Sequence, residues 1–181
     1  MENIKKVLVL AVSPRRGGNS DTLSDEFVRG AKEVGHNVEK VFVRDKKIGY
    51  CTGCYYCEKS GGVCAIKDDM PELLEKIIAA DVLVMATPVY FYCMNAQLRT
   101  VIDRTVARYT EIKDKEAYLI ATAGEDEDHA VEGTVTAFRG YLECLENVRE
   151  AGLVLAIGVH IPGEVKDRPY MQQAYEMGKN V

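Results

Sequence analysis

The sequence contains no apolar run that approaches the ~20 residues needed to cross a bilayer, so we expect no membrane partner. It also lacks an excess of positive charge, because the formal net charge is −5 and the lysines and arginines are scattered along the chain. A nucleic-acid partner requires a concentrated basic surface, which this composition does not favour. The amino terminus leads straight into a strand-like segment without the small-residue cleavage site of a signal peptide, which predicts a cytoplasmic protein.

Histidine is scarce, and His36, His129 and His160 are too far apart in the sequence to suggest a pair of metal ligands. The chain also has no internal repeat, low-complexity tract or linker segment. Its 181 residues suffice for one domain with a substantial hydrophobic core. We therefore expect a single domain over residues 1–181.

Apolar runs rich in β-branched residues alternate along the chain with segments of helical periodicity. We expect strands at 4–12, 37–43, 81–87, 116–123 and 152–160, and helices at about 20–34, 71–78, 97–108, before 149 and at 170–177. This alternation predicts an α/β fold with a parallel sheet that helices cover on both faces. In such a fold the ligand lies beyond the carboxyl ends of the strands.

The loop after the first strand, Ser13-Pro-Arg-Arg-Gly-Gly-Asn-Ser-Asp-Thr22, has a composition suited to a phosphate group. It supplies hydroxyl groups, an amide and a cation at position 15 or 16, and its glycines permit close backbone approach. The loop is neither a dinucleotide fingerprint nor a Walker loop, since G-x-G-x-x-G and Gly-Lys-Ser/Thr are both absent. The alternative is a polar turn whose Asn or Ser caps the helix that follows.

Four of the six cysteines crowd into one short segment, Cys51-x-x-Cys54-x-x-Cys57 followed by Cys64. In a cytosolic protein such clustering indicates metal or redox chemistry more than structural disulfides. Thiolates are soft ligands that suit iron–sulfur clusters and zinc.

Three segments together resemble the NADPH-dependent FMN reductase branch of the flavodoxin-like superfamily. They are Ser-Pro-Arg…Asn-Ser-x-Thr at 13–22, Ala-Asp-Val-Leu-Val-Met-Ala-Thr-Pro-Val-Tyr at 80–90 and Gln-Leu-Arg-Thr-Val-Ile-Asp-Arg at 97–104. The resemblance implies a flavodoxin-like three-layer sandwich whose five-stranded parallel sheet has the order 2-1-3-4-5. It also implies one FMN-binding domain with a cysteine-rich insertion at about 49–66 and a tail at about 162–181.

In that family the first loop holds the FMN phosphate, and two later loops border the isoalloxazine ring. The resemblance therefore implies phosphate contacts from Ser13, Arg15, Asn19, Ser20 and Thr22. The residues implied at the ring are Pro88, Val89, Tyr90, Phe91, Asn95, Thr122, Ala123 and Gly124. All three loops leave the carboxyl ends of predicted strands, which agrees with a shared ligand site. The alternative for the aromatic residues at 90–92 is a patch of core or subunit interface.

The cysteine segment resembles that of the iron–sulfur flavoproteins, a sister group on the same fold. This resemblance implies that Cys51, Cys54, Cys57 and Cys64 are ligands of a [4Fe-4S] cluster that exchanges electrons with FMN. The form Cys-x-Gly-Cys-x-x-Cys…Gly-x-Cys-x-x-x-Asp-Asp-Met also resembles a stretch of other flavodoxin-like reductases. In that alternative the thiols are structural, packed near the flavin or paired in a redox disulfide. Zinc is a further alternative.

Flavin chemistry requires position and electrostatics from the protein more than acid–base catalysis, so we assign no catalytic side chain. We expect a reductase in which NAD(P)H reduces FMN and a quinone, free flavin, metal or ferredoxin-like partner takes the electrons. The alternative is a carrier that relays electrons between a cluster, FMN and a ferredoxin-like partner. A nucleotide-binding sensor is a third hypothesis, which a single domain without an appended module does not favour. The resemblance also implies a homodimer or homotetramer.

Overall fold

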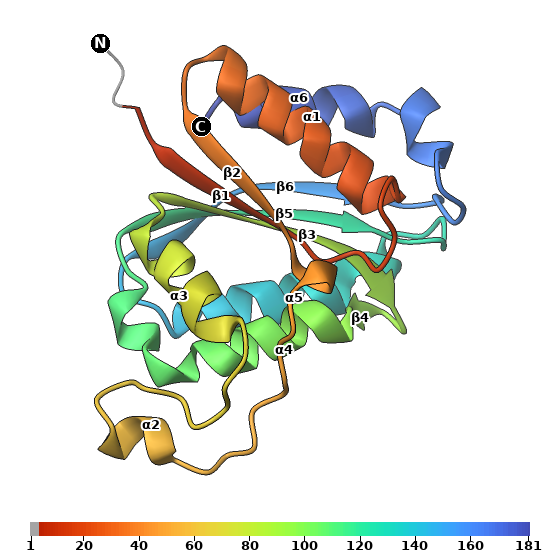
Figure 1. Ribbon diagram of the computed structural model, residues 1–181. Coiled ribbons are helices and arrows are strands. Elements are labelled where there is room, and N and C mark those ends of the chain that lie inside the picture. Colours follow the sequence, from red (N-terminus) through yellow and green to blue (C-terminus); the bar gives the residue numbers. More distant parts are fainter. Residues whose placement is uncertain (1–3) are drawn as a thin grey trace.

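Five parallel strands form the central sheet of this computed structural model, which describes residues 4–181 (Figure 1). The strands are β1 (Lys6–Ala11), β2 (Asn37–Phe42), β3 (Val82–Tyr90), β5 (Lys115–Thr122) and β6 (Val148–Ala156), in the spatial order β2-β1-β3-β5-β6. The predicted sheet order 2-1-3-4-5 is therefore confirmed, once the short strand β4 (Cys93–Met94) is set aside. Residues 1–3 lie outside the described residues. They belong to the amino-terminal segment in which the sequence predicts no signal-peptide cleavage site.

Helices cover both faces of the sheet, as the alternating pattern predicts (Figure 1). One face carries α1 (Asn19–Glu33) and α6 (Tyr170–Lys179), and the other carries α3 (Met70–Ala79), α4 (Ala96–Arg104) and α5 (His129–Glu143). The short 3-10 helices are η1 (Val43–Asp45), η2 (Thr105–Ala107), η3 (Tyr109–Glu111) and η4 (Glu164–Asp167). The four-residue helix α2 (Tyr56–Lys59) lies in a loop that extends away from the sheet. Within residues 4–181 no helix is long and apolar enough to cross a membrane.

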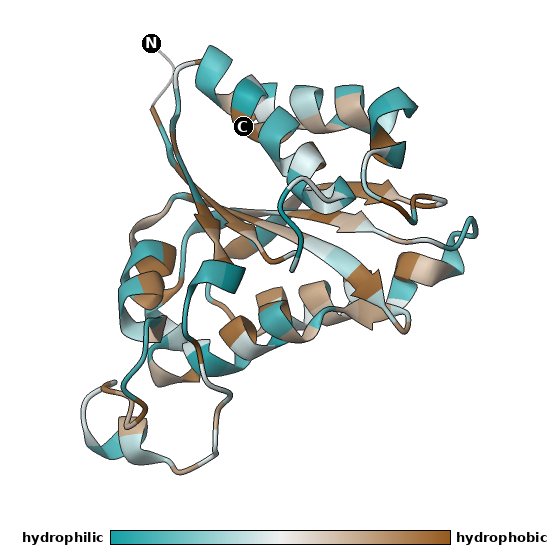
Figure 2. Ribbon diagram, turned by 45° about the vertical axis from the view of Figure 1, so that its right-hand side comes forward, coloured by the Kyte–Doolittle hydropathy of each residue, from teal (hydrophilic) through white to brown (hydrophobic). Residues whose placement is uncertain are grey.

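The buried strands divide their side chains between two cores. In β1, Val7 and Val9 pack on the side of α1 and α6, while Leu8 and Leu10 pack on the side of α3, α4 and α5. All four side chains are buried, because helices cover both faces of the sheet. This two-sided burial explains the continuous apolar run in the sequence. Figure 2 shows hydrophobic residues concentrated in the strands between the two helical layers.

β6 lies earlier in the chain than the predicted range 152–160. The first half of β6 contains the charged residues Arg149 and Glu150, so it does not show the apolar run that predicts a strand. β6 is an edge strand, so these side chains stay at the surface, where they pair with Glu116 and Arg139 respectively. An edge strand does not require a continuous apolar pattern, and this is why the predicted strand starts too late and the preceding helix is predicted to end too late.

β3 continues past Pro88, where the sequence predicts its interruption, and forms a hairpin with β4. β1 pairs with β3 only as far as Ala86, and β4 pairs with it only from Val89, so Pro88 lies in the gap between these pairings, where a proline is tolerated. The hairpin turn consists of Phe91 and Tyr92, whose φ angles are 50° and 62°. Two successive left-handed residues form a tight hairpin turn, for which Asn and Gly are the usual residues. Phe91 and Tyr92 therefore adopt a backbone conformation that is unfavourable for aromatic residues.

α6 packs against α1 at two glycines. A Cβ atom at Gly30 would lie 2.1 Å from the carbonyl oxygen of Tyr175, and one at Gly178 would lie 2.1 Å from that of Phe27. The two backbones therefore approach at distances that leave no room for a side chain. The helix predicted in the tail is confirmed, and this contact fixes it on the same face of the sheet as α1.

Candidate functional site

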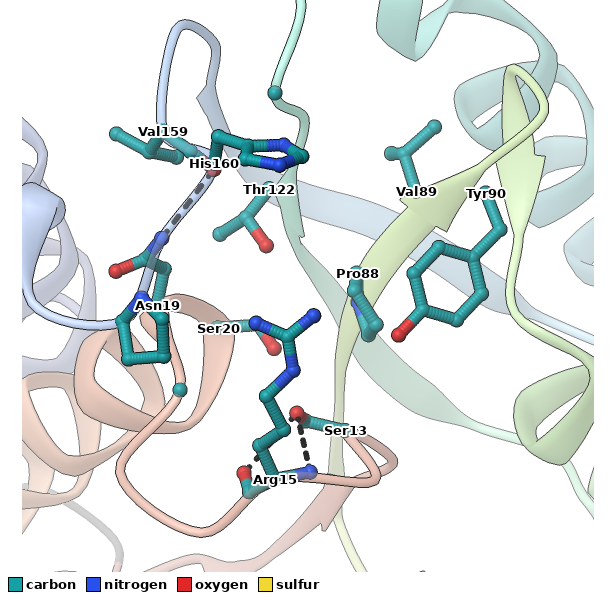
Figure 3. Close-up of a pocket in the computed structure, with 13 residues that line it drawn as sticks. Ser13, Arg15, Asn19, Ser20, Pro88, Val89, Tyr90, Thr122, Val159 and His160 are labelled. Carbon is teal, nitrogen blue, oxygen red and sulfur yellow. Dashed lines mark hydrogen bonds between the residues drawn. The ribbon is translucent and has the colours of Figure 1, made fainter.

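A cleft of about 150 Å³ opens at the carboxyl ends of the parallel strands (Figure 3). The loop after β1, the end of β3 and the end of β5 line it together, and the loop after β6 completes it. The strand connections leave β1 and β3 in opposite directions, toward helices on the two faces, so the cleft lies at the switch point of the sheet.

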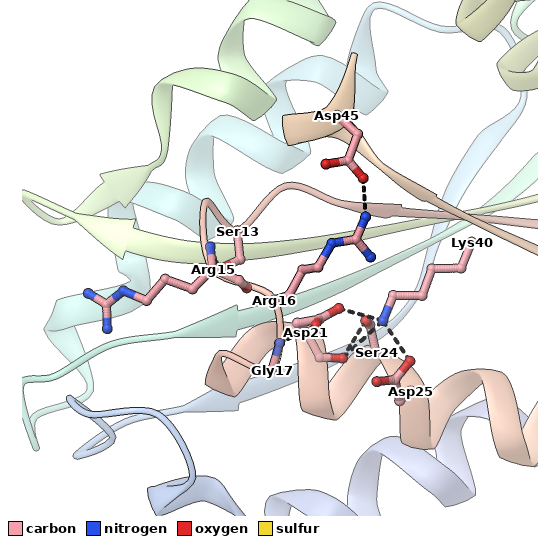
Figure 4. A network of polar contacts seen from close by, with 9 residues as sticks. All are labelled: Ser13, Arg15, Arg16, Gly17, Asp21, Ser24, Asp25, Lys40 and Asp45. Carbon is pink, nitrogen blue, oxygen red and sulfur yellow. Dashed lines mark hydrogen bonds and ion pairs between the residues drawn. The ribbon is translucent and has the colours of Figure 1, made fainter.

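Ser13, Arg15 and Ser20 form one side of the cleft. The N–H of Arg15 donates to Ser13 Oγ at 3.1 Å, which closes the loop on itself. The Arg15 guanidinium points into the cleft, whereas that of Arg16 points in the opposite direction (Figures 3 and 4). Arg15 is therefore the cation at the cleft, a choice that the sequence leaves open between positions 15 and 16.

α1 begins at this loop, and its first turn borders the cleft. Gly18 is the N-cap residue, and within residues 4–181 no side chain caps the helix there. The N–H groups of the first turn and the positive end of the helix dipole therefore favour an anion. A Cβ atom at Gly18 would lie 3.2 Å from Ser13 Oγ, so the glycine keeps this part of the loop close-packed.

The amide of Asn19 binds other parts of the protein at the edge of the cleft. Its Nδ2 donates to the carbonyl oxygens of Ile161 at 2.9 Å and Val159 at 3.3 Å. Its Oδ1 accepts from the N–H of Gly163 at 3.0 Å. Asn19 thus joins the start of α1 to the loop after β6. Thr22 lies further along α1, half-buried and outside the cleft lining.

The end of β3 forms the wall opposite the phosphate loop. Pro88, Val89 and Tyr90 line this wall, and the Tyr90 ring lies beside Pro88 (Figure 3). Thr122 and Gly124, at the end of β5, line the cleft between this wall and the loop after β6. The structure therefore brings most of the residues implied for the ring to one place.

Three residues implied for the ring lie outside the cleft lining. Ala123 is buried in the core, and Phe91 is 99% exposed at the tip of the hairpin. Asn95 is buried and caps α4, with its Oδ1 accepting from the N–H of Leu98 at 3.1 Å. Its Nδ2 donates to the carbonyl oxygen of Val12 at 2.7 Å, so this amide joins the loop after β1 to the loop after β3.

The residues expected from the sequence omit Val159, His160 and Pro162, which line the cleft from the loop after β6. The His160 imidazole lies next to Gly124, where a Cβ atom would be 2.8 Å from its Nδ1. The sequence could have indicated these residues, because any loop at the carboxyl end of a parallel strand borders this edge of the sheet. The predicted strand at 152–160 runs through two of these residues and conceals the loop.

The cysteine segment forms the loop around α2 (Figure 1). Cys51 and Cys54 are exposed, Cys57 and Cys64 are partly buried, and all four are free thiols. The N–H of Tyr56 bonds to the Cys54 sulfur and lowers its pKa. Among residues 4–181, no group of three or more Cys, His, Asp or Glu side chains is placed to hold a single metal ion such as zinc. The four thiols have the donor chemistry of an iron–sulfur cluster.

Arg104 of α4 holds the base of this loop and is itself buried. Its Nη1 lies 2.6 Å from Asp68 Oδ2 and donates to the carbonyl oxygen of Gly49 at 2.6 Å, while its Nη2 lies 3.5 Å from Cys64 Sγ. Burial disfavours the charged form of Asp68, but the hydrogen bonds from Arg104 and from two backbone N–H groups outweigh it and lower the pKa. Through Gly49, Cys64 and Asp68, Arg104 therefore ties both ends of the cysteine segment to α4.

The chain resembles known proteins over nearly its whole length. The family described as NADPH-dependent FMN reductase matches residues 5–150. An iron–sulfur flavoprotein of Archaeoglobus fulgidus is 31% identical over 179 residues, which cover 97% of this chain and 78% of that protein. An iron–sulfur flavoprotein of Methanocaldococcus jannaschii is 38% identical over 100 residues, which cover 55% of this chain and 51% of that protein. This second match thus spans about half the length of that relative.

Solved structures share the same fold. An NAD(P)H:quinone oxidoreductase from Methanothermobacter marburgensis superposes with a TM-score of 0.77 at 22% identity, covering 98% of this chain and 96% of that one. At this level of identity the likeness concerns the fold rather than the site. The flavodoxin-like fold that the sequence implies is confirmed.

Proposed function

Since this chain belongs to the NADPH-dependent FMN reductase family, we propose that its cleft binds FMN, which NAD(P)H reduces and which a quinone, a flavin or another acceptor reoxidises. The protein is an FMN-dependent oxidoreductase. The observation that carries the proposed site is the meeting of the phosphate loop, the end of β3 and the end of β5 at one cleft.

The FMN phosphate is proposed to lie over the first turn of α1. There the unpaired N–H groups and the helix dipole favour an anion, and the Arg15 guanidinium adds a full positive charge. The hydroxyl groups of Ser13 and Ser20 supply neutral donors beside it. Asn19 acts indirectly, because its amide holds the loop after β6 against this turn.

The isoalloxazine ring is proposed to rest between the end of β3 and the end of β5. The cleft of about 150 Å³ is smaller than the ~300–1,000 Å³ of typical small-molecule pockets, so we expect the ring to extend to its mouth, where a nicotinamide can reach it. Bound FMN supplies the hydride and electron chemistry. Tyr90 and Pro88 position the ring from one side, and Thr122 and Gly124 do so from the other.

The phosphate site is tested by Arg15→Met and by Arg29→Met, which changes an exposed arginine further along α1. Dissociation constants are measured by flavin fluorescence for FMN and for riboflavin, which lacks the phosphate. We expect Arg15→Met to weaken FMN binding about tenfold and to leave riboflavin binding nearly unchanged. Arg29→Met should change the affinity for neither ligand. If the ratio of the FMN and riboflavin dissociation constants is the same in Arg15→Met as in the wild type, the phosphate does not bind beside Arg15.

A second candidate function is electron relay between FMN and an iron–sulfur cluster. It is favoured by the match to an iron–sulfur flavoprotein over 97% of this chain and by the four thiols at 51–64. In this candidate Cys51, Cys54, Cys57 and Cys64 would be the ligands of the cluster. A ferredoxin-like protein then becomes the partner that donates or accepts electrons.

Iron and acid-labile sulfide measured on protein purified without oxygen separate the two functions. The relay predicts about four irons per chain, together with bound FMN. It also predicts that Cys54→Ser loses the iron while Cys144→Ser keeps it, because Cys144 is an exposed free thiol outside the segment. Bound flavin without iron would reject the relay and leave the NAD(P)H-linked reductase.

A further inference from the structure

The proposed phosphate loop is held from behind by side chains that do not face the cleft (Figure 4). From this arrangement we propose that Lys40 is a positioning residue for FMN and that it acts through Asp21. Asp21 fixes the loop, and Lys40 balances the Asp21 charge so that this charge does not repel the FMN phosphate. The inference rests on the proposed FMN site and gives a role to two residues outside the cleft lining.

Asp21 determines the shape of the loop through Gly17. Its Oδ2 accepts a hydrogen bond from the Gly17 N–H at 2.7 Å, and its side chain is almost fully buried. Gly17 has a φ of 67°, a left-handed conformation that suits glycine. The hydrogen bond to the Asp21 carboxylate holds the Gly17 backbone in this conformation.

The same carboxylate creates an electrostatic conflict. Asp21 belongs to the first turn of α1, where the helix terminus attracts an anion. A phosphate monoester carries a charge of about −1.5 to −2 at neutral pH, so a buried carboxylate in that turn competes with it for the same positive potential. Without a counter-charge, the residue that shapes the loop would also weaken the binding of its ligand.

Lys40 of β2 supplies the counter-charge from the side away from the cleft (Figure 4). Its Nζ lies 2.5 Å from Asp21 Oδ1 and donates to the Asp21 carbonyl oxygen at 3.2 Å. The same ammonium group lies 2.6 Å from Asp25, but that carboxylate is 64% exposed and is screened by water. The partly buried Asp21–Lys40 pair is screened much less.

Two arginines also hold the outer side of the loop. Arg44 Nη1 donates to the carbonyl oxygen of Pro14 at 2.5 Å. Arg16 forms an ion pair with Asp45 and lies over the Phe42 ring, 4.5 Å from its centroid. The Lys40 ammonium also lies 5.9 Å from the centroid of the Phe42 ring. Because the Arg44–Pro14 and Arg16–Asp45 contacts do not involve the Lys40 side chain, we expect the loss of Lys40 to alter the charge at the loop more than its shape.

The experiment compares Lys40→Met with the double variant Lys40→Met/Asp21→Asn. The control is Lys76→Met. Lys76 of α3 lies 2.5 Å from Glu39, the neighbour of Lys40 in β2, and forms no ion pair with residues 13–22 of the loop. We expect Lys40→Met to raise the dissociation constant of FMN about tenfold, or ~1.4 kcal/mol, and that of riboflavin less than about twofold. The double variant recovers FMN affinity, since asparagine keeps an acceptor for Gly17 without the charge. Lys40→Arg keeps wild-type affinity.

Equal losses for FMN and riboflavin in Lys40→Met, or no recovery in the double variant, would overturn the role of Lys40. Circular dichroism identifies a variant that fails to fold. If Lys40→Met does not fold, the FMN and riboflavin dissociation constants are compared between Lys40→Arg and Lys40→Gln instead. The Arg15→Met protein separates this failure from failure of the site itself. If Arg15→Met selectively weakens FMN binding and Lys40→Met does not, the phosphate site stands and only the role of Lys40 falls. If neither is selective, both fall.

Discussion

Arg104 and Asp68 face each other in a two-point ion pair, with Nη1 2.6 Å from Oδ2 and Nη2 3.0 Å from Oδ1. Asp68 follows the cysteine loop in the chain, and Arg104 ends α4, so α3, β3 and β4 lie between the two residues. Both side chains are less than 10% exposed. The pair therefore closes the base of the cysteine loop from inside the protein, where water screens it little.

Removing one partner of this pair leaves a buried charge unmatched. We expect Arg104→Met to lower the free energy of unfolding by about 3–5 kcal/mol. Arg99→Met, in the same helix, breaks an exposed pair with Asp103 and should cost less than about 1 kcal/mol. Urea unfolding of the two variants measures both values. Equal costs would show that the Arg104 pair contributes no more than a surface pair.

The pH dependence of stability tests Asp68 directly. Its pKa is lowered in the folded protein, so its contribution is fully present above the unfolded pKa of about 3.9 and is lost as pH falls through the lower folded value. The difference in unfolding free energy between the wild type and Asp68→Asn should therefore stay constant between about pH 5 and 8 and shrink below about pH 4. A difference that changes instead near neutral pH would assign the effect to another group.

Two glycines of α5 should respond in opposite ways to alanine. A Cβ atom at Gly133 would lie 2.3 Å from the carbonyl oxygen of Tyr92, so Gly133→Ala should displace the hairpin and cost about 1–3 kcal/mol. Gly140 faces open space within the described chain, and Gly140→Ala should stabilise the helix by about 0.5–1 kcal/mol. Thermal unfolding of the pair checks the signs. Because the hairpin also carries Tyr90, only Gly133→Ala should weaken FMN binding.

The turn residue Phe91 offers a gain in stability. Its side chain is 99% exposed and its backbone is left-handed, so Phe91→Asn removes strain without removing packing. We expect the free energy of unfolding to rise by about 1 kcal/mol. Tyr92→Asn is the comparison, because the Tyr92 ring packs 5.2 Å from the His129 ring and its loss offsets the gain. A Phe91→Asn protein less stable than the wild type would show that the exposed ring makes a stabilising contact.

Local patterns in the sequence predict most of this fold. The apolar run of β1, the loop at 13–22 and the periodicity of α1 each depend on neighbouring residues, and the structure places each where the pattern indicates. β6 departs from its predicted range, because charged residues at a sheet edge break the apolar pattern without ending the strand. β3 also departs from its predicted range, since it continues through Pro88.

The parts of the site that the sequence could not predict depend on distant partners. The amide of Asn95 bonds to Val12, 83 residues away, and that of Asn19 bonds to Val159, 140 residues away. The resemblance implies flavin contacts for both amides, and only the folded chain shows that each joins two segments around the cleft. The pairing of Arg104 with Asp68 is hidden for the same reason, since it spans 36 residues.

The contact between α1 and α6 also constrains how this sequence can diverge. A side chain at Gly30 would displace the backbone near Tyr175, and one at Gly178 would displace the backbone near Phe27. Either change should push α6 away from α1, whose first turn borders the cleft. In homologous proteins with this tail, positions 30 and 178 should therefore covary, remaining small together or enlarging only where the last helix has moved outward.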